Sequence, residues 1–218
     1  MLELSGICKS YHRQNILDGV ELTVRPGECV GIVGYNGCGK TTLLSIIAGA
    51  LKADKGSILF NGRQAVGHPR VFAEEENPLM EELTVRDNLL LWYRGSRTGM
   101  EEDLRSGAAA MLGVDKMLDR TAGRLSGGMK KRVSIACALS NHAPVLIMDE
   151  PGAALDLECK ELIRNYLQEY MAGGGAVVLT SHELAELAMC TDMYALKQCR
   201  LTKIVNGSSA EELIRQFR

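Results

Sequence analysis

One stretch decides the fold class of this 218-residue chain: Gly34-Tyr35-Asn36-Gly37-Cys38-Gly39-Lys40-Thr41. It fits the pattern G-x-x-x-x-G-K-[ST], in which glycines allow successive backbone N–H groups to turn toward phosphate oxygens. The apolar segment 29–33 before it predicts a buried strand, and the segment 41–48 after it predicts a helix that stops at Gly49. A strand, a glycine loop and a helix in this order predict a phosphate-binding loop, because the positive end of the helix faces the same anion.

Three side chains of this loop have distinct predicted properties. Lys40 supplies a mobile positive charge for the β- and γ-phosphates of a nucleotide, and the Thr41 hydroxyl can ligate Mg²⁺. We interpret Cys38 as a small residue that fills the loop. The alternative is a thiol sensitive to oxidation, since a helix N-terminus can lower the pKa of a thiol.

Two acidic residues and a histidine stand at the ends of later strands. Asp149 and Glu150 close a strand predicted over 145–149, and His182 follows one predicted over 176–180. Doubly wound sheets bind their ligands at the carboxyl ends of strands, so we expect these three side chains near the phosphates. Asp149 is the predicted Mg²⁺ ligand, Glu150 the candidate general base, and His182 a candidate contact of the γ-phosphate.

The order of predicted elements indicates an α/β protein. Strand-rich segments at 2–33 and 56–62 precede a helical stretch, and strands alternate with helices again after Pro144. This alternation favours a mostly parallel sheet covered on both faces. We predict a P-loop NTPase fold with a mostly parallel core sheet, an antiparallel β edge and an inserted helical subdomain. The predicted helices beyond the phosphate loop are 85–92, capped by Thr84, and 101–112, 126–140, 156–172, 183–190 and 209–217.

The composition excludes several classes of protein. With 25 Lys+Arg against 27 Asp+Glu the net charge is −2, so no global positive field favours nucleic acid as a partner. The apolar runs are far shorter than the ~20 residues that cross a bilayer, and the first residues predict no secretory signal. Seven cysteines without a C-x-x-C pair indicate reduced thiols rather than a disulfide framework or a zinc site.

A second anion-binding surface is predicted at Leu125-Ser126-Gly127-Gly128-Met129, which opens a helix. Ser126 is a good N-cap, and the glycines expose backbone N–H groups at the positive end of the helix. An isolated S-G-G can equally be a capped helix and nothing more. At this point the order of motifs resembles the ATP-binding subunit of ABC transporters over essentially the whole chain.

The resemblance extends motif by motif. Residues 125–129 resemble the family's LSGGQ signature, Asp149-Glu150 its Walker B pair, 153–156 its D-loop and His182 its switch histidine. Tyr11 sits where the family stacks an aromatic ring on adenine. The resemblance implies the following nucleotide-binding residues: Tyr11, Gly34, Tyr35, Asn36, Gly37, Cys38, Gly39, Lys40, Thr41 and Thr42.

The family implies a head-to-tail dimer, either a homodimer or a heterodimer, in which each ATP lies between the phosphate loop of one subunit and the signature helix of the other. ATP closes the dimer, hydrolysis opens it, and a separate integral membrane permease converts the motion into transport. The subunit is then cytoplasmic and peripheral on the inner face of the membrane. The residues that would serve the partner's nucleotide are Ser126, Gly127, Gly128, Met129 and Asp156.

Two positions depart from the family pattern. Met129 replaces the signature Gln and is followed by Lys130-Lys131-Arg132, which resembles the exporter branch with a six-helix permease. Glu75 stands where the family has a Gln. A glutamate there could still reach Mg²⁺, but it adds negative charge near the γ-phosphate, and a solvated acidic loop tip is the alternative.

These residues predict an ATPase that uses Mg²⁺ and ATP to drive transport, with export as the expected direction. The chain is expected to form one domain over 1–218, with a nucleotide-binding core at 1–83 and 143–218 and a helical signature subdomain at 84–142. The alternatives are an ABC ATPase with soluble partners that does not transport, and a small P-loop kinase. The kinase alternative is disfavoured by the signature, the acidic pair and His182.

Overall fold

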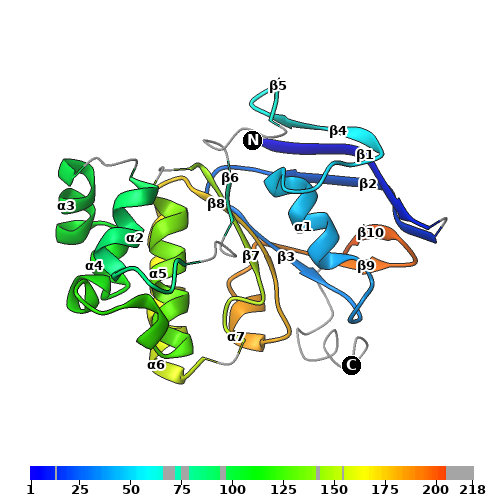
Figure 1. Ribbon diagram of the computed structural model, residues 1–218. Coiled ribbons are helices and arrows are strands. Elements are labelled where there is room, and N and C mark those ends of the chain that lie inside the picture. Colours follow the sequence, from blue (N-terminus) through cyan, green and yellow to red (C-terminus); the bar gives the residue numbers. More distant parts are fainter. Residues whose placement is uncertain are drawn as a thin grey trace.

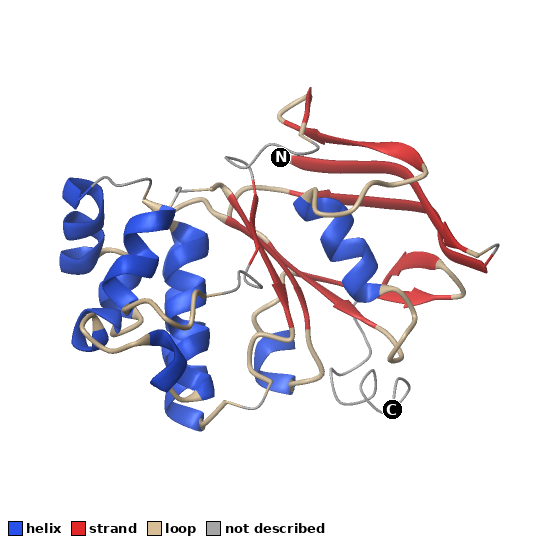
Figure 2. Cartoon of the chain, viewed as in Figure 1, coloured by secondary structure: helices blue, strands red, loops and turns tan. Residues whose placement is uncertain are grey.

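The computed structural model describes residues 1–12, 14–65, 72–74, 79–93, 97–140, 143–153 and 155–204. A six-stranded core sheet crosses the middle of the molecule, an antiparallel sheet lies on one side of it, and most helices lie on the other (Figures 1 and 2). The core sheet has the strand order β10 (Arg200–Lys203), β9 (Asp192–Lys197), β3 (Cys29–Val33), β8 (Ala176–Thr180), β7 (Val145–Asp149), β6 (Phe72–Glu74).

Five strands of the core sheet run parallel, and β10 pairs with β9 in the antiparallel sense. Successive side chains of a strand point to opposite faces, and β7 shows the consequence. Val145 and Ile147 pack into one hydrophobic cluster with α1 (Lys40–Ala48), while Leu146 and Met148 pack into a second cluster with the helices on the other face. Burial on both faces explains why these strands read as unbroken apolar runs.

The antiparallel sheet has the order β2 (Gln14–Val24), β1 (Leu2–Tyr11), β4 (Lys55–Phe60), β5 (Arg63–Gln64). Asn61 and Gly62 join β4 to β5 with φ values of 50° and 73°, the left-handed backbone of a tight hairpin turn. Helix α1 lies between this sheet and the core sheet, and its Leu43 and Ile47 are fully buried there (Figure 1). The predicted strands at 2–33 are therefore present, but longer than their sequence pattern indicated.

Two helices of the helical part begin at the predicted N-cap residues. Thr84 Oγ1 accepts a hydrogen bond from the Asp87 N–H at the start of α2, and Ser126 does the same for Met129 at the start of α5. The α-helices of this part are α2 (Val85–Trp92), α3 (Arg97–Ser106), α4 (Ala108–Met111) and α5 (Gly127–Leu139), with short 3-10 turns at Val114–Met117 and Ala122–Arg124.

Two helix predictions need correction, and a third lies outside the described residues. The helix predicted over 101–112 is broken at Gly107, whose backbone is extended, because the Asp103 carboxylate accepts the Ala109 N–H and starts α4 anew. The helix predicted over 183–190 is only α7 (Leu184–Leu187), whereas α6 (Leu157–Ala172) matches 156–172. The helix predicted over 209–217 lies outside the described residues.

The α/β fold with a mostly parallel core sheet, an antiparallel edge and inserted helices is confirmed. Strands β9 and β10 were not predicted, because most of their residues are partly buried or exposed and mix polar with apolar side chains. Within the described ranges, no helix is both long and apolar enough to cross a membrane.

The contact between β4 and β1 yields a stability prediction. Gly56 has a φ of +96°, and a Cβ added there would lie 2.6 Å from backbone atoms of Ser5 and Gly6. We expect Gly56→Ala to lower the free energy of unfolding by about 2–4 kcal/mol, from left-handed backbone strain plus an overlap that no side-chain movement relieves. Urea unfolding at 25 °C measures this loss.

Gly62→Ala is the matched control. Its φ is +73°, but nothing lies within 4 Å of the added Cβ, so only the backbone strain of about 1 kcal/mol remains. Equal losses for the two variants would contradict the close approach of β4 to β1.

Candidate functional site

The phosphate loop connects β3 to α1 and is held by its own lysine. Lys40 Nζ donates hydrogen bonds to the carbonyl oxygens of Gly34, at 2.8 Å, and Tyr35, at 3.2 Å. The side chain is largely enclosed, with Lys40 only 7% exposed. The chain thus satisfies the ammonium group with backbone acceptors, and the loop is already curved around it.

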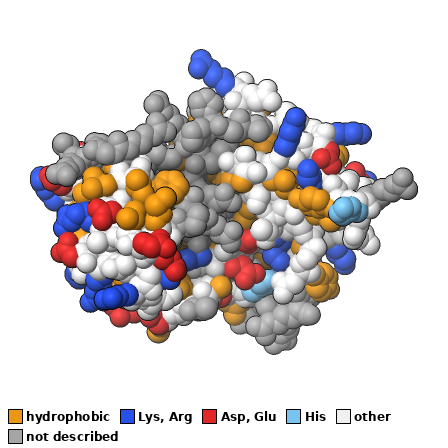
Figure 3. All heavy atoms as spheres, viewed as in Figure 1, with side chains coloured by type: hydrophobic (Ala, Val, Ile, Leu, Met, Phe, Trp, Pro, Cys, Tyr) orange, Lys and Arg blue, Asp and Glu red, His pale blue; other side chains and the backbone are white. Residues whose placement is uncertain are grey.

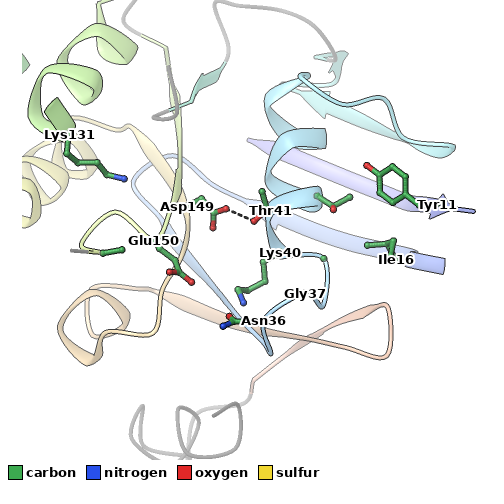
Figure 4. A pocket seen from close by; sticks show the side chains of 12 residues that line it. Tyr11, Ile16, Asn36, Gly37, Lys40, Thr41, Lys131, Asp149 and Glu150 are labelled. Atoms are coloured by element: carbon green, nitrogen blue, oxygen red, sulfur yellow. Dashed lines mark hydrogen bonds between the residues drawn. The ribbon is translucent and has the colours of Figure 1, made fainter. Parts of the chain in front are cut away.

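Asp149 is joined to the start of α1. It ends β7, and Thr41 Oγ1 donates to its Oδ2 at 2.6 Å (Figure 4). Thr180, at the end of the adjacent strand β8, donates its hydroxyl proton to Oδ1 of the same carboxylate. Hydroxyl and carboxylate oxygens are the hard ligands that Mg²⁺ binds, so the donor set at Thr41 and Asp149 fits this ion.

Glu150 and His182 meet just beyond the sheet edge. His182 Nε2 lies 3.2 Å from Glu150 Oε1, although the two atoms lack the alignment of a hydrogen bond. Glu150 has a left-handed backbone with φ of 49°, and its N–H is directed at the Thr180 carbonyl oxygen and hydroxyl, each 3.1 Å away. The end of β8 thereby fixes the turn that carries Glu150.

Lys40, Thr41, Asp149 and Glu150 line one open cleft of about 680 Å³ (Figure 4), whereas His182 does not line it. Of the residues predicted to bind nucleotide, Gly34, Tyr35 and Cys38 do not line it. The sequence missed Ile16, Lys131 and Ala153 as cleft residues. The cleft is lined by Tyr11, Ile16, Asn36, Gly37, Gly39, Lys40, Thr41, Thr42, Lys131, Asp149, Glu150 and Ala153.

Lys131 reaches the cleft from the helical part. It belongs to α5, and its side chain extends toward the end of β7 (Figure 4). Burial lowers the pKa of its ammonium group, while the negative charges of Glu186, Asp149 and Glu150 act in the opposite direction. In the sequence it stood only within the run 130–132 that resembles the exporter branch, so no sequence signal distinguished it from its neighbours.

The signature residues do not line this cleft. Ser126 and Gly127 are exposed at the N-terminus of α5, and Asp156 caps α6 by accepting the Cys159 N–H at 2.8 Å. Cys159 Sγ in turn lies 3.6 Å from the Gly128 carbonyl oxygen, which ties the starts of the two helices together. The starts of α5 and α6 therefore present a joint surface that is separate from the cleft of the same chain.

Two predicted positions cannot be placed. Glu75, the predicted third metal group, and Ala154 of the D-loop segment lie outside the described residues. Asp156 and Ala153, on either side of Ala154, are described.

Comparison with known proteins agrees with this fold. The ABC transporter family matches residues 17–153. The Nod factor export ATP-binding protein I of Paraburkholderia xenovorans (strain LB400) is 34% identical over 216 residues, covering 95% of this chain and 70% of that protein. A solved ATP-binding subunit of an ABC transporter superposes with a TM-score of 0.88 at 30% identity, covering 99% of this chain and 98% of the other.

A dimeric ATP-binding cassette bound to ADP and Pi also superposes, with a TM-score of 0.83 at 26% identity, covering 95% of this chain and all of the other. Fold and cleft define a P-loop ATPase. The chain belongs to the ABC transporter family and is an ATP-binding subunit, an ATPase, of that family.

The environment of Cys38 favours one of the two interpretations of its thiol. Burial raises the pKa of the Cys38 thiol, against the opposing effects of the Lys40 charge and of backbone N–H groups. A raised thiol pKa leaves less thiolate at pH 7, so the structure favours a loop-filling residue over an activated thiol.

We therefore expect iodoacetamide to alkylate Cys38 more slowly than glutathione at pH 7, with a rate that rises steeply as the pH passes the ordinary thiol range. Mass spectrometry of the phosphate-loop peptide measures the rate, and saturating ATP should slow it further. A rate at pH 7 equal to or above that of glutathione would contradict the assignment.

Proposed function

We propose that this ATPase hydrolyses Mg-ATP in a head-to-tail dimer of cassettes, and that separate membrane subunits convert the resulting motion into export. The proposal is carried by one observation: Thr41 and Asp149 are in contact at the mouth of the phosphate loop, with Glu150 and His182 beside them. A hydroxyl, two carboxylates and an imidazole at one edge of a sheet supply the groups needed to hold and hydrolyse a nucleotide.

ATP is proposed to lie along the cleft. Tyr11 lines its far end and is 43% exposed, with Lys9 Nζ 5.5 Å from its ring centroid, and its ring is proposed to stack on adenine. The phosphates would lie against the N–H groups of the loop and the N-terminus of α1, where Lys40 can exchange carbonyl acceptors for phosphate oxygens. The proposed nucleotide-binding residues are Tyr11, Gly34, Tyr35, Asn36, Gly37, Cys38, Gly39, Lys40, Thr41 and Thr42.

Thr41 and Asp149 are the residues proposed to hold Mg²⁺, and Glu75 stays a prediction as a third group. When bound, the ion would neutralise charge on the β- and γ-phosphates. Asp149 accepts hydrogen bonds from the hydroxyl groups of Thr41 and Thr180, so its carboxylate is held in place before any ligand arrives.

Glu150 is proposed as the general base. It lines the cleft and would take a proton from a water molecule at the γ-phosphate, and His182, 3.2 Å from it, is proposed to contact the same phosphate. The Glu150 side chain is 41% exposed and lines the cleft, whereas His182 is 30% exposed, does not line the cleft and has a buried Nε2.

The Glu150→Gln variant tests this assignment. An amide keeps the size of the side chain but cannot accept a proton, so we expect ATP binding within about threefold of the parent and turnover reduced by at least about 100-fold. Equilibrium binding of a fluorescent ATP analogue and release of inorganic phosphate are the measurements.

Glu161→Gln is the matched control, because Glu161 is an exposed glutamate of α6 whose contact with Arg164 is 3.9 Å long. It should hydrolyse ATP at the parental rate. Multiple turnover by Glu150→Gln at that rate would overturn the base assignment, and phosphate release that required an added acceptor would favour a kinase.

A second cassette, identical or different, is proposed to complete each site. Ser126, Gly127, Gly128, Met129 and Asp156 lie away from their own cleft, and nothing lies within 4 Å of the Cβ position of Gly127. The exposed, capped N-terminus of α5 is therefore available to an anion held by another chain. The dimeric relative bound to ADP and Pi supports this arrangement.

The permease is proposed to dock on the helical part, residues 84–142, which together with the core at 1–83 and 143–218 forms one domain. Hydrophobic side chains gather on this side of the molecule (Figure 3). Met80, Leu91 and Trp92 are exposed, and Asn88 bonds to the Met80 backbone one helical turn before Leu91 and Trp92. Such a patch suits a membrane partner and would hold the subunit at the inner face of the membrane.

Export is the direction suggested by the relative from Paraburkholderia xenovorans, which is named for Nod factor export.

Leu91→Gln tests the docking surface. Leu91 is 52% exposed, so a polar side chain there should leave folding intact and weaken an apolar contact. We expect at least about tenfold less co-purification with a multispan membrane protein encoded by a neighbouring gene, while the isolated subunit keeps its ATPase rate. Undiminished co-purification would place the permease elsewhere.

A further inference from the structure

Glu186 is a buried carboxylate close to the catalytic pair but outside the cleft. It lies on α7 and is only 5% exposed. Burial raises the pKa of its carboxyl group, while the hydrogen bond from Ser181 and the charge of Lys160 act to lower it. A carboxylate in such a place is costly unless its oxygens have hydrogen-bond donors, so its partners indicate what it does.

The first partner belongs to the turn after β8. Ser181 directly precedes His182 and is 1% exposed. Its hydroxyl donates to Glu186 Oε2 and accepts the Glu183 N–H at 2.9 Å. The Ser181 hydroxyl is thus held by the side chain of Glu186 and by the backbone of Glu183. The residues directly before and after His182 are therefore bonded to each other.

The second partner belongs to the turn after β7. Gly152 stands two residues after Glu150, and its N–H stabilises the ionised Glu186. A Cβ added at Gly152 would lie 2.3 Å from Glu186 Oε1, so this backbone passes directly over the other carboxylate oxygen. Each oxygen of one carboxylate therefore faces one of the two turns.

The pairing of β7 with β8 does not extend into the two turns that follow these strands. The parallel register of β7 and β8 ends at Asp149 and Thr180, and Glu150 makes its backbone contact with Thr180. Beyond those residues the two strands continue into separate turns, and the Glu186 carboxylate contacts both turns. We propose that Glu186 is a positioning residue that sets the separation of Glu150 and His182 by tying both turns to α7.

This inference rests on the proposed roles of Glu150 and His182 but predicts a structural effect that can be seen without turnover. His182 is one of four histidines in the chain, so its imidazole NMR signals can be assigned by comparison with His182→Gln. In the nucleotide-free full chain, Glu186→Ala and Ser181→Ala should both shift these signals, because each removes one end of the same contact.

The kinetic expectation is a loss in kcat without a matching change in KM. We expect Glu186→Ala to lower kcat for ATP by at least about tenfold with KM within about twofold, since displacement of reacting groups by less than 1 Å is costly. Glu186→Gln keeps the shape and one acceptor oxygen, and should recover part of the rate and the parental His182 signal. The double variant Ser181→Ala/Glu186→Ala should be no slower than Glu186→Ala alone.

Glu161→Ala is the matched control, an exposed glutamate that should change neither the signal nor kcat. An unchanged His182 signal in folded Glu186→Ala and Ser181→Ala, together with parental kcat, would overturn the proposal. If Glu150→Gln retained turnover, the base assignment would fail, while a shifted His182 signal in Ser181→Ala would still support the positioning role.

Discussion

The parallel pairing of β3, β8 and β7 is the constraint on which the site depends. Its register sets Ile32 against Thr180 and Thr180 against Asp149, so the ends of the three strands lie side by side. The phosphate loop, the Glu150 turn and the His182 turn each leave the sheet at this edge. Burial of alternate side chains on both faces locks the register, because a slip by one residue would exchange the two hydrophobic clusters.

Several polar groups at this edge are satisfied by one another before any ligand binds. The Lys40 ammonium group bonds to carbonyl oxygens of its own loop, and Asp149 accepts two hydroxyl groups. Glu186 is likewise held by the Ser181 hydroxyl. Because each bond replaces one that water would make, the cleft is ordered in advance, and binding has to exchange partners rather than arrange the side chains from disorder.

Helix α5 relates the cleft to the outer surface of the same chain. Its first turn, at Ser126 and Gly127, is exposed away from the cleft, whereas Lys131 reaches the acidic end of β7. Cys159 joins the start of this helix to the start of α6. In the proposed dimer, a rigid helix of this kind would meet the partner's nucleotide at one end and the acidic pair of its own chain a little farther along.

The sequence by itself determined the elements whose signals are local. Strands β3, β7 and β8 match their predicted residues, because unbroken apolar runs between turn residues have few alternatives, and Thr84 and Ser126 cap helices through their own side chains. The phosphate loop and the acidic pair were recognisable because their signals are local too.

Only the tertiary structure decided the rest. Strands β9 and β10 exist through pairing with distant or weakly patterned residues, and the break at Gly107 depends on Asp103. Ile16 and Lys131 became cleft residues, and Glu186 became a partner of Ser181 and Gly152, through packing of separate elements. Such contacts join residues that no periodicity links, so they follow from how the elements pack and not from how each one forms.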